Sequence, residues 1–168
     1  MVDDIKYFFK ISFPTLSILF LIFLNLFLSN SFLDFGQLFA FQAIFFWLLY
    51  LPKFLPLYII LILGIIQDII YLSPIGSTAL IFLLLIFLFE TYNKFFLEPS
   101  FFELFISFIA LFTIGMIAFW GLNSLINLKF LLININFLYE ILLNLFFFPI
   151  NYFFLHLLFK KLNLNKKL

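Results

Sequence analysis

Long apolar runs, separated by short polar or turn-forming breaks, fill almost the whole chain. The runs lack the strict alternation of apolar and polar residues that marks a membrane-spanning strand, so the pattern predicts helices rather than a barrel. A helix needs ~20 mostly apolar residues to cross a bilayer. We therefore predict an all-α protein with one integral membrane domain over residues 1–168. Its six predicted transmembrane helices cover roughly 13–30, 36–51, 54–71, 76–92, 102–128 and 136–159.

The breaks between the runs contain residues that are typical of turns. Pro52 and Pro56 flank Lys53 between the second and third runs, and Ser73–Gly76 separates the third run from the fourth. The second run is barely long enough to span a bilayer, so a re-entrant hairpin stays an alternative for that segment.

Composition supports the membrane prediction and excludes several other classes of protein. Hydrophobic residues make up 67% of the chain and charged residues 10%, against ~45–50% and ~25% in soluble domains. A soluble enzyme could not hide so much apolar surface, and a disordered chain would not contain it. The net charge of +1 offers no field for nucleic acid, and the absence of cysteine excludes thiol chemistry.

Lysine positions predict the orientation in the membrane, because short cytoplasmic loops carry the excess of positive charge. With six spans, one side of the membrane holds only Lys129, and the other side holds all the remaining lysines: Lys6, Lys10, Lys53, Lys94, Lys160, Lys161, Lys166 and Lys167. Both termini are therefore predicted to be cytoplasmic.

Asp68 stands out because it lies inside the third apolar run. A carboxylate in hydrocarbon costs at least ~2.5–3.5 kcal/mol, so Asp68 should face the bundle interior and find partners there. Gly64 lies one turn earlier on the same face, where it lets another backbone approach, and Gln67 adds an amide beside the acid. Two interpretations stay open. Asp68 binds a partner, a proton or a ligand, or it caps a helix end by tethering the Ser73–Thr78 turn.

Glu140 is a second acid within an apolar run, near the start of the sixth predicted span and on the same side of the membrane as Asp68. A carboxylate in the first turn of a helix is stabilised by the helix dipole. The alternatives are an ion pair with Lys129 or with a partner's base, and a cation or proton site shared with Asp68. Two isolated carboxylates are not a metal motif. We predict no metal site, no cofactor and no catalytic residue.

The last run contains two further features. Pro149, five residues after Asn144, lacks a backbone donor and predicts a kink in the sixth helix. His156 lies four residues before Lys160, where we expect an interfacial side chain rather than a ligand.

The pattern Gly64-x3-Asp68-x7-Gly76 resembles the MreD family, the rod shape-determining membrane proteins of bacteria. The resemblance extends in both directions. The second run carries Trp47 and Tyr50 before Leu51-Pro52, at a spacing similar to that in the family. Asn144-x4-Pro149 with its basic tail looks like the family's C-terminus. Gln67 departs from the pattern, because an apolar residue would be ordinary at that position.

The resemblance implies a non-catalytic, multi-pass protein of the bacterial inner membrane that is not an enzyme. MreD proteins associate with the single-span protein MreC. With MreB, RodA and a class B penicillin-binding protein they organise lateral peptidoglycan synthesis and cell shape. Besides membrane lipid, these are the implied partners. Gly64, Asp68 and Gly76 would shape the hairpin between the third and fourth spans and a groove for a partner segment. The further residues implied to bind a partner or support the structure are Gln67, Glu140, Asn144 and Pro149.

The alternative is a substrate-binding S component of an energy-coupling-factor vitamin transporter, a class of six-helix proteins whose fold looks similar. Such a protein needs a pocket with convergent polar groups, for which Asp68, Gln67 and Glu140 would be candidates. Its coupling surface usually carries small residues on the first helix, whereas Phe13–Leu28 contains neither glycine nor alanine. A transporter acting alone is disfavoured because the chain lacks inverted repeats. The shape-determining role is therefore preferred.

Overall fold

The computed structural model describes residues 12–24, 38–92, 100–126, 128 and 135–161, and over these ranges the regular elements are all helical. A first helix, Ser12–Leu24, is followed by α2 (Leu38–Tyr50), the 3-10 helix η1 (Pro52–Phe54), α3 (Leu57–Ile70), α4 (Ser77–Tyr92), α5 (Phe101–Ile126) and α6 (Ile135–Lys161). The predictions of an all-α chain and of six helices are confirmed for the described residues.

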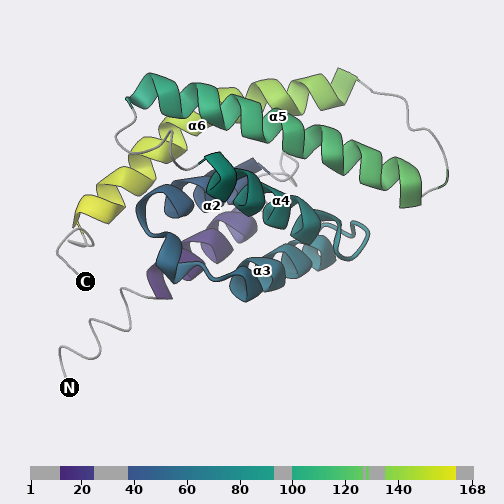
Figure 1. The fold of residues 1–168 in the computed structure, drawn as a ribbon, viewed down its shortest axis with the longest axis horizontal. Coiled ribbons are helices and arrows are strands. Elements are labelled where there is room, and N and C mark those ends of the chain that lie inside the picture. Colours follow the sequence, from purple (N-terminus) through teal and green to yellow (C-terminus); the bar gives the residue numbers. More distant parts are fainter. Residues whose placement is uncertain (1–11, 25–37, 93–99, 127, 129–134, 162–168) are drawn as a thin grey trace.

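The helices run back and forth across the molecule and form two groups (Figure 1). The long helices α5 and α6 lie on one side, and the first helix lies with α2, α3 and α4 on the other. Among α2 to α6, the pairs with the most extensive packing are α3 with α4, α2 with α6 and α4 with α5. The α3–α4 turn lies at one end of the molecule, opposite η1 and the C-terminal end of α6 (Figure 1).

Helix lengths differ from the predicted spans. Only α5 and α6 are long and apolar enough, among the described helices, to cross a membrane. The 14 residues of α3 cover about 21 Å at about 1.5 Å per residue, against ~30 Å of hydrocarbon. Helix α3 is shorter at both ends than the predicted span 54–71. Pro56 is extended, with φ −64° and ψ 151°, so α3 begins only at Leu57, and Leu72 turns the chain with φ 53°.

The core is centred on α2, where every residue from Phe39 to Leu48 is buried. A helix that is apolar on all sides is expected to lie inside a bundle. Its buried aromatic rings pack against α5 and α6. Phe108 and Phe148 stack with their centroids 4.0 Å apart, and Phe45 meets both of them edge-on. Aromatic packing of this kind adds about 0.5–1.5 kcal/mol per pair beyond the buried area.

The first helix is joined to α2 by a polar contact within this apolar core. The indole N–H of Trp47 donates to the Ser17 hydroxyl at 2.7 Å. That hydroxyl in turn donates to the Pro14 carbonyl at 2.7 Å, three residues earlier in the same helix. The fully buried indole therefore keeps its hydrogen bond.

Candidate functional site: the α3–α4 turn

The α3–α4 turn folds back over Asp68, whose side chain is fully buried near the C-terminal end of α3. Two positive φ angles reverse the chain, 53° at Leu72 and 96° at Gly76. Glycine suits the second position because it has no Cβ to restrict it. The reversal brings Ser73–Thr78 next to the carboxylate.

The Asp68 carboxylate accepts hydrogen bonds on both oxygens. Oδ1 accepts from the Ser73 hydroxyl at 2.7 Å, the Ser77 hydroxyl at 3.2 Å and the Thr78 N–H at 3.1 Å. Oδ2 accepts from the Gly76 N–H at 2.7 Å. The Thr78 hydroxyl lies within hydrogen-bonding distance of both Oδ1 and the Gly64 carbonyl. All the hydrogen bonds described for this carboxylate come from residues of one turn.

This geometry makes Asp68 a cap for α4, supplied from the preceding helix. The first N–H groups of a helix have no partner within the helix, and its N-terminus carries partial positive charge. Asp68 accepts from the N–H groups of Gly76 and Thr78 and so places its side-chain oxygens at that end. The contacts are those that the tethering interpretation predicts. A role for Asp68 in binding a partner, proton or ligand stays a prediction.

Gly64 lies where α3 and α4 come closest. A Cβ built on Gly64 would lie 2.4 Å from the Cα of Ala79 and 2.7 Å from its backbone nitrogen. No other residue fits without moving the α4 backbone. The close approach predicted for Gly64 is therefore present, and it brings the Thr78 hydroxyl within 2.8 Å of the Gly64 carbonyl.

Gln67 is buried beside this cluster without joining it. Its Oε1 has no hydrogen-bond partner within the described part of the chain. Its backbone carbonyl accepts from the Tyr71 N–H at 3.0 Å, as a helix end requires. The Tyr71 hydroxyl donates to the Ile22 carbonyl at 3.3 Å, which joins this end of α3 to the first helix.

The structure does not bring Glu140 to Asp68. Helix α6 begins at Ile135, so Glu140 lies beyond the first turn, and the expected first-turn dipole stabilisation is wrong. Its described backbone contact is with Asn144, whose Nδ2 donates to the Glu140 carbonyl at 3.3 Å. Lys129, the predicted alternative partner, lies outside the described residues. Within the described ranges, no group of three residues could hold a metal ion.

Asn144 instead belongs to a second buried polar cluster, between α2 and α6. The Gln42 Nε2 donates to the Asn144 carbonyl at 3.1 Å and to its Oδ1 at 3.0 Å. The Asn151 Nδ2 donates to the Gln42 Oε1 at 3.1 Å. All three side chains are buried. Asn144 and Asn151 lie on either side of Pro149, which is inside α6. Helix α6 changes direction along its length, as the proline predicts (Figure 1).

Gln42 and Asn151 were not predicted as site residues. One signal was available, because Asn144 and Asn151 are seven residues apart and so lie on the same helical face. Two amides on one face of an apolar helix need a partner from another helix. Gln42, the only glutamine within α2, is that partner.

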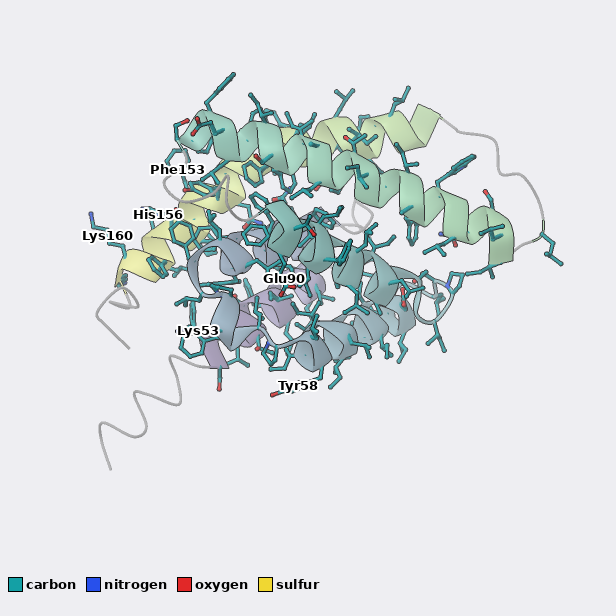
Figure 2. All side chains as sticks on the ribbon, in the orientation of Figure 1. Lys53, Tyr58, Glu90, Phe153, His156 and Lys160 are labelled. Atoms are coloured by element: carbon teal, nitrogen blue, oxygen red, sulfur yellow. The ribbon has the colours of Figure 1, made fainter. Side chains whose placement is uncertain are left out.

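A third group of residues lies at the C-terminal ends of α2 and α6. The hydroxyls of Tyr50 and Tyr152 are 2.7 Å apart, and the His156 ring stacks on Tyr152 with centroids 6.0 Å apart. The His156 Nδ1 is buried without a partner among the described residues. His156 is thus part of an aromatic group, one turn before the exposed Lys160 at the same end of α6 (Figure 2).

The fold and its polar clusters define a class of protein: an all-helical chain of apolar helices, two of them long enough to cross a membrane, with buried hydrogen-bonded groups between the helices. The chain belongs to the MreD family, because the family model described as rod shape-determining protein MreD matches residues 5–162. The resemblance seen in the sequence is therefore confirmed. Searches of the curated proteins and of the solved structures found no match. Family membership assigns the chain a role in rod shape determination, in a family that is not known to be enzymatic.

Proposed function

We propose that this chain is a multi-pass inner-membrane component of the cell-elongation complex, where it binds MreC and helps to organise lateral peptidoglycan synthesis. In the wider complex it acts with MreB, RodA and a class B penicillin-binding protein. The observation that carries the proposal is the family match over residues 5–162, which leaves little of the chain outside the family. In this role the chain positions other proteins and does no chemistry itself.

The α3–α4 turn supports the proposal by its rigidity. Its fully buried carboxylate accepts all its described hydrogen bonds from one turn, which supports a role in the fold rather than in binding a mobile ligand. A hairpin fixed in this way presents the exposed side chains of α3 in one arrangement. A protein that positions others benefits from such fixed surfaces because less ordering entropy is lost on binding.

The proposed topology has both termini in the cytoplasm. Figure 2 supports it, because Lys53 and Lys160 lie at the same end of the molecule, away from the α3–α4 turn. A periplasm-active reporter fused after Leu168 should be inactive, and a cytoplasm-active reporter should be active there. Periplasmic activity would contradict this topology.

Purification of the tagged chain from its own host in mild detergent tests the proposed function. Mass spectrometry should identify a single-span MreC-type protein together with RodA-type proteins. Asp68→Asn should reduce their recovery, because an amide N–H₂ cannot accept from the donors that Asp68 now binds. Glu90→Gln, at an exposed carboxylate of α4, is the matched control. Recovery of two ATPases and a coupling subunit would support a vitamin transporter instead.

A further inference from the structure

A pocket of about 320 Å³ lies between the start of the first helix and the segment from η1 to the first turn of α3. Ser12 and Thr15 contribute hydroxyls from the first helix, and Lys53 and Tyr58 contribute an ammonium group and a phenol from the facing segment. The described residues that line the pocket include no acidic side chain, so the Lys53 ammonium is the charged group of its lining. The pocket therefore favours an anion that accepts several hydrogen bonds, as a phosphate does.

The remaining lining of the pocket is apolar and comes from Leu16, Phe54, Pro56 and Ile59. Leu16 is 51% exposed and Tyr58 is 66% exposed, so the pocket opens toward the outer surface of the bundle. A ligand that matches both parts of the lining is anionic in one part and apolar in the adjoining part. A phospholipid has this chemistry, because its headgroup phosphate is joined through glycerol to acyl chains. Inorganic phosphate lacks the apolar part.

The pocket lies toward the end of the molecule that the proposed topology places at the cytoplasmic face of the membrane. Lys53 and Tyr58 lie away from the α3–α4 turn, toward the same end as Lys160 (Figure 2). Tyrosine rings gather at the level of the lipid headgroups, and lysine extends its ammonium group to that level. Basic pockets between membrane helices on the cytoplasmic side bind anionic headgroups. Position and charge therefore agree on a lipid headgroup.

We propose that this pocket binds the headgroup of an anionic phospholipid. The phosphate accepts hydrogen bonds from the Lys53 ammonium, the Tyr58 phenol and the hydroxyls of Ser12 and Thr15, and an acyl chain leaves along Leu16. A zwitterionic lipid fits less well because its own ammonium group approaches that of Lys53. The inference takes only the topology from the proposed function. It adds a ligand-binding site that requires no partner protein.

Native mass spectrometry of the full chain in detergent measures the Kd of the first bound phosphatidylglycerol molecule. Lys53→Gln removes the charge from the pocket and should raise this Kd about fivefold, the effect of one lysine near an anionic lipid surface. Lys160→Gln is the matched control, because it removes the same charge at the same end of the molecule without lining the pocket. Its Kd should equal that of wild type. An equal increase in Kd for the two variants would overturn the proposal, since it would reflect surface charge in general.

A second variant tests the pocket without changing the charge. Tyr58→Phe removes one hydrogen-bond donor from an exposed side chain, so it should raise the Kd about threefold at an unchanged melting temperature. Tyr139→Phe makes the same change at an exposed position of α6 that does not line the pocket, and it should leave the Kd unchanged. Wild-type affinity in both Lys53→Gln and Tyr58→Phe would overturn the proposal.

Two further ligands distinguish an anionic lipid from other sources of phosphate. Phosphatidylcholine, which is zwitterionic, should bind the wild-type chain about fivefold more weakly than phosphatidylglycerol. Inorganic phosphate at the same concentration should not displace phosphatidylglycerol, because it makes no apolar contact. Displacement by phosphate, or equal affinity for the two lipids, would overturn the proposal. None of these measurements involves a partner protein, so their failure is distinguishable from failure to recover the single-span protein, which tests the proposed function.

Discussion

At the α3–α4 turn, the Asp68 carboxylate accepts hydrogen bonds from residues five to ten positions further along the chain. Between α2 and α6, three neutral amides meet across more than a hundred positions. Both clusters are buried in an apolar bundle. The turn cluster organises a local reversal of the chain, whereas the amide cluster fixes how two distant helices pack.

The two clusters should also differ in how much stability is lost when one residue is replaced. The Asp68 side chain accepts from several donors at once, so its removal takes a partner from all of them, and the N–H groups of Gly76 and Thr78 lose the only partner described for them. In the other cluster, removal of Gln42 takes a partner from two oxygens of Asn144 and from the Asn151 Nδ2, and removal of Asn151 takes one only from Gln42. A buried donor or acceptor that loses its partner costs about 1–3 kcal/mol, and more when the partner is charged. The turn should therefore be the more sensitive of the two.

Asp68→Leu should cause the largest loss of stability of the variants compared. It leaves the N–H groups of Gly76 and Thr78 unpaired and the Ser73 hydroxyl with only the backbone carbonyl of residue 68 at 3.5 Å, with an expected loss of about 3–5 kcal/mol. Thermal unfolding in detergent measures the loss. Glu90→Leu, at an exposed carboxylate, should stay within about 0.5 kcal/mol of wild type. Equal losses of stability for the two variants would show that Asp68 contributes no more to folding than an exposed carboxylate does.

Gly64→Ala should be the next largest effect, because its new Cβ would meet the backbone of Ala79 at 2.4 Å. Overpacking of this kind costs about 1–3 kcal/mol, and a backbone neighbour places the expected loss at the upper end. Gly121→Ala is the control, since nothing lies within 4 Å of its new Cβ. The control should be neutral or stabilising by up to about 1 kcal/mol. If Gly64→Ala and Gly121→Ala changed the stability in the same direction, the close approach of α3 and α4 would be contradicted.

Gln42→Leu tests the amide cluster and should cost about 1–2 kcal/mol, less than Asp68→Leu. A double-mutant cycle with Asn151→Leu sharpens the result. Because the two side chains share one hydrogen bond, the double variant should lose about 1 kcal/mol less than the sum of the single losses. Strict additivity, measured by unfolding in detergent, would indicate that the amides act independently.

Gly76→Ala should give the smallest effect. Its Cβ would meet no atom within 4 Å, so the cost is that of a positive φ alone, about 1 kcal/mol. Gly76→Asn should cost less, because asparagine adopts positive φ more readily than alanine. If the two variants melt at the same temperature, backbone conformation at Gly76 does not limit the stability of the turn.

The difference between the clusters also explains what the sequence could predict. Asp68, Gly64 and the Ser73–Thr78 turn are close in the chain, and a carboxylate inside an apolar run is conspicuous. Gln42 and Asn151 are neutral, and their contact spans 109 positions, so nothing local marks them as partners. The residues of the family pattern were therefore found, and the packing partners of Asn144 were missed.

The helix ends were also predicted where nearby residues mark them and missed where no residue type marks them. Pro52 and Pro56 correctly marked a break, but the 3-10 turn between them moved the start of α3 to Leu57. The positive φ of Leu72 had no signal, because leucine seldom adopts that conformation. The start of α6 was predicted to within one residue, at 136 against Ile135, so Glu140 already lay beyond the first turn and the dipole argument did not apply to it.

The unequal helix lengths have a consequence for the surrounding lipid. Helix α3 covers about 21 Å and α5 about 39 Å, so no single bilayer thickness matches both. In the proposed multi-pass topology, lipid beside the exposed apolar face of α3 would thin, and α5 would tilt or draw thicker lipid around it. Hydrophobic mismatch of opposite sign on two flanks deforms the membrane asymmetrically. Neighbouring proteins would then be sorted around this chain by the thickness of their own spans, before any direct contact forms.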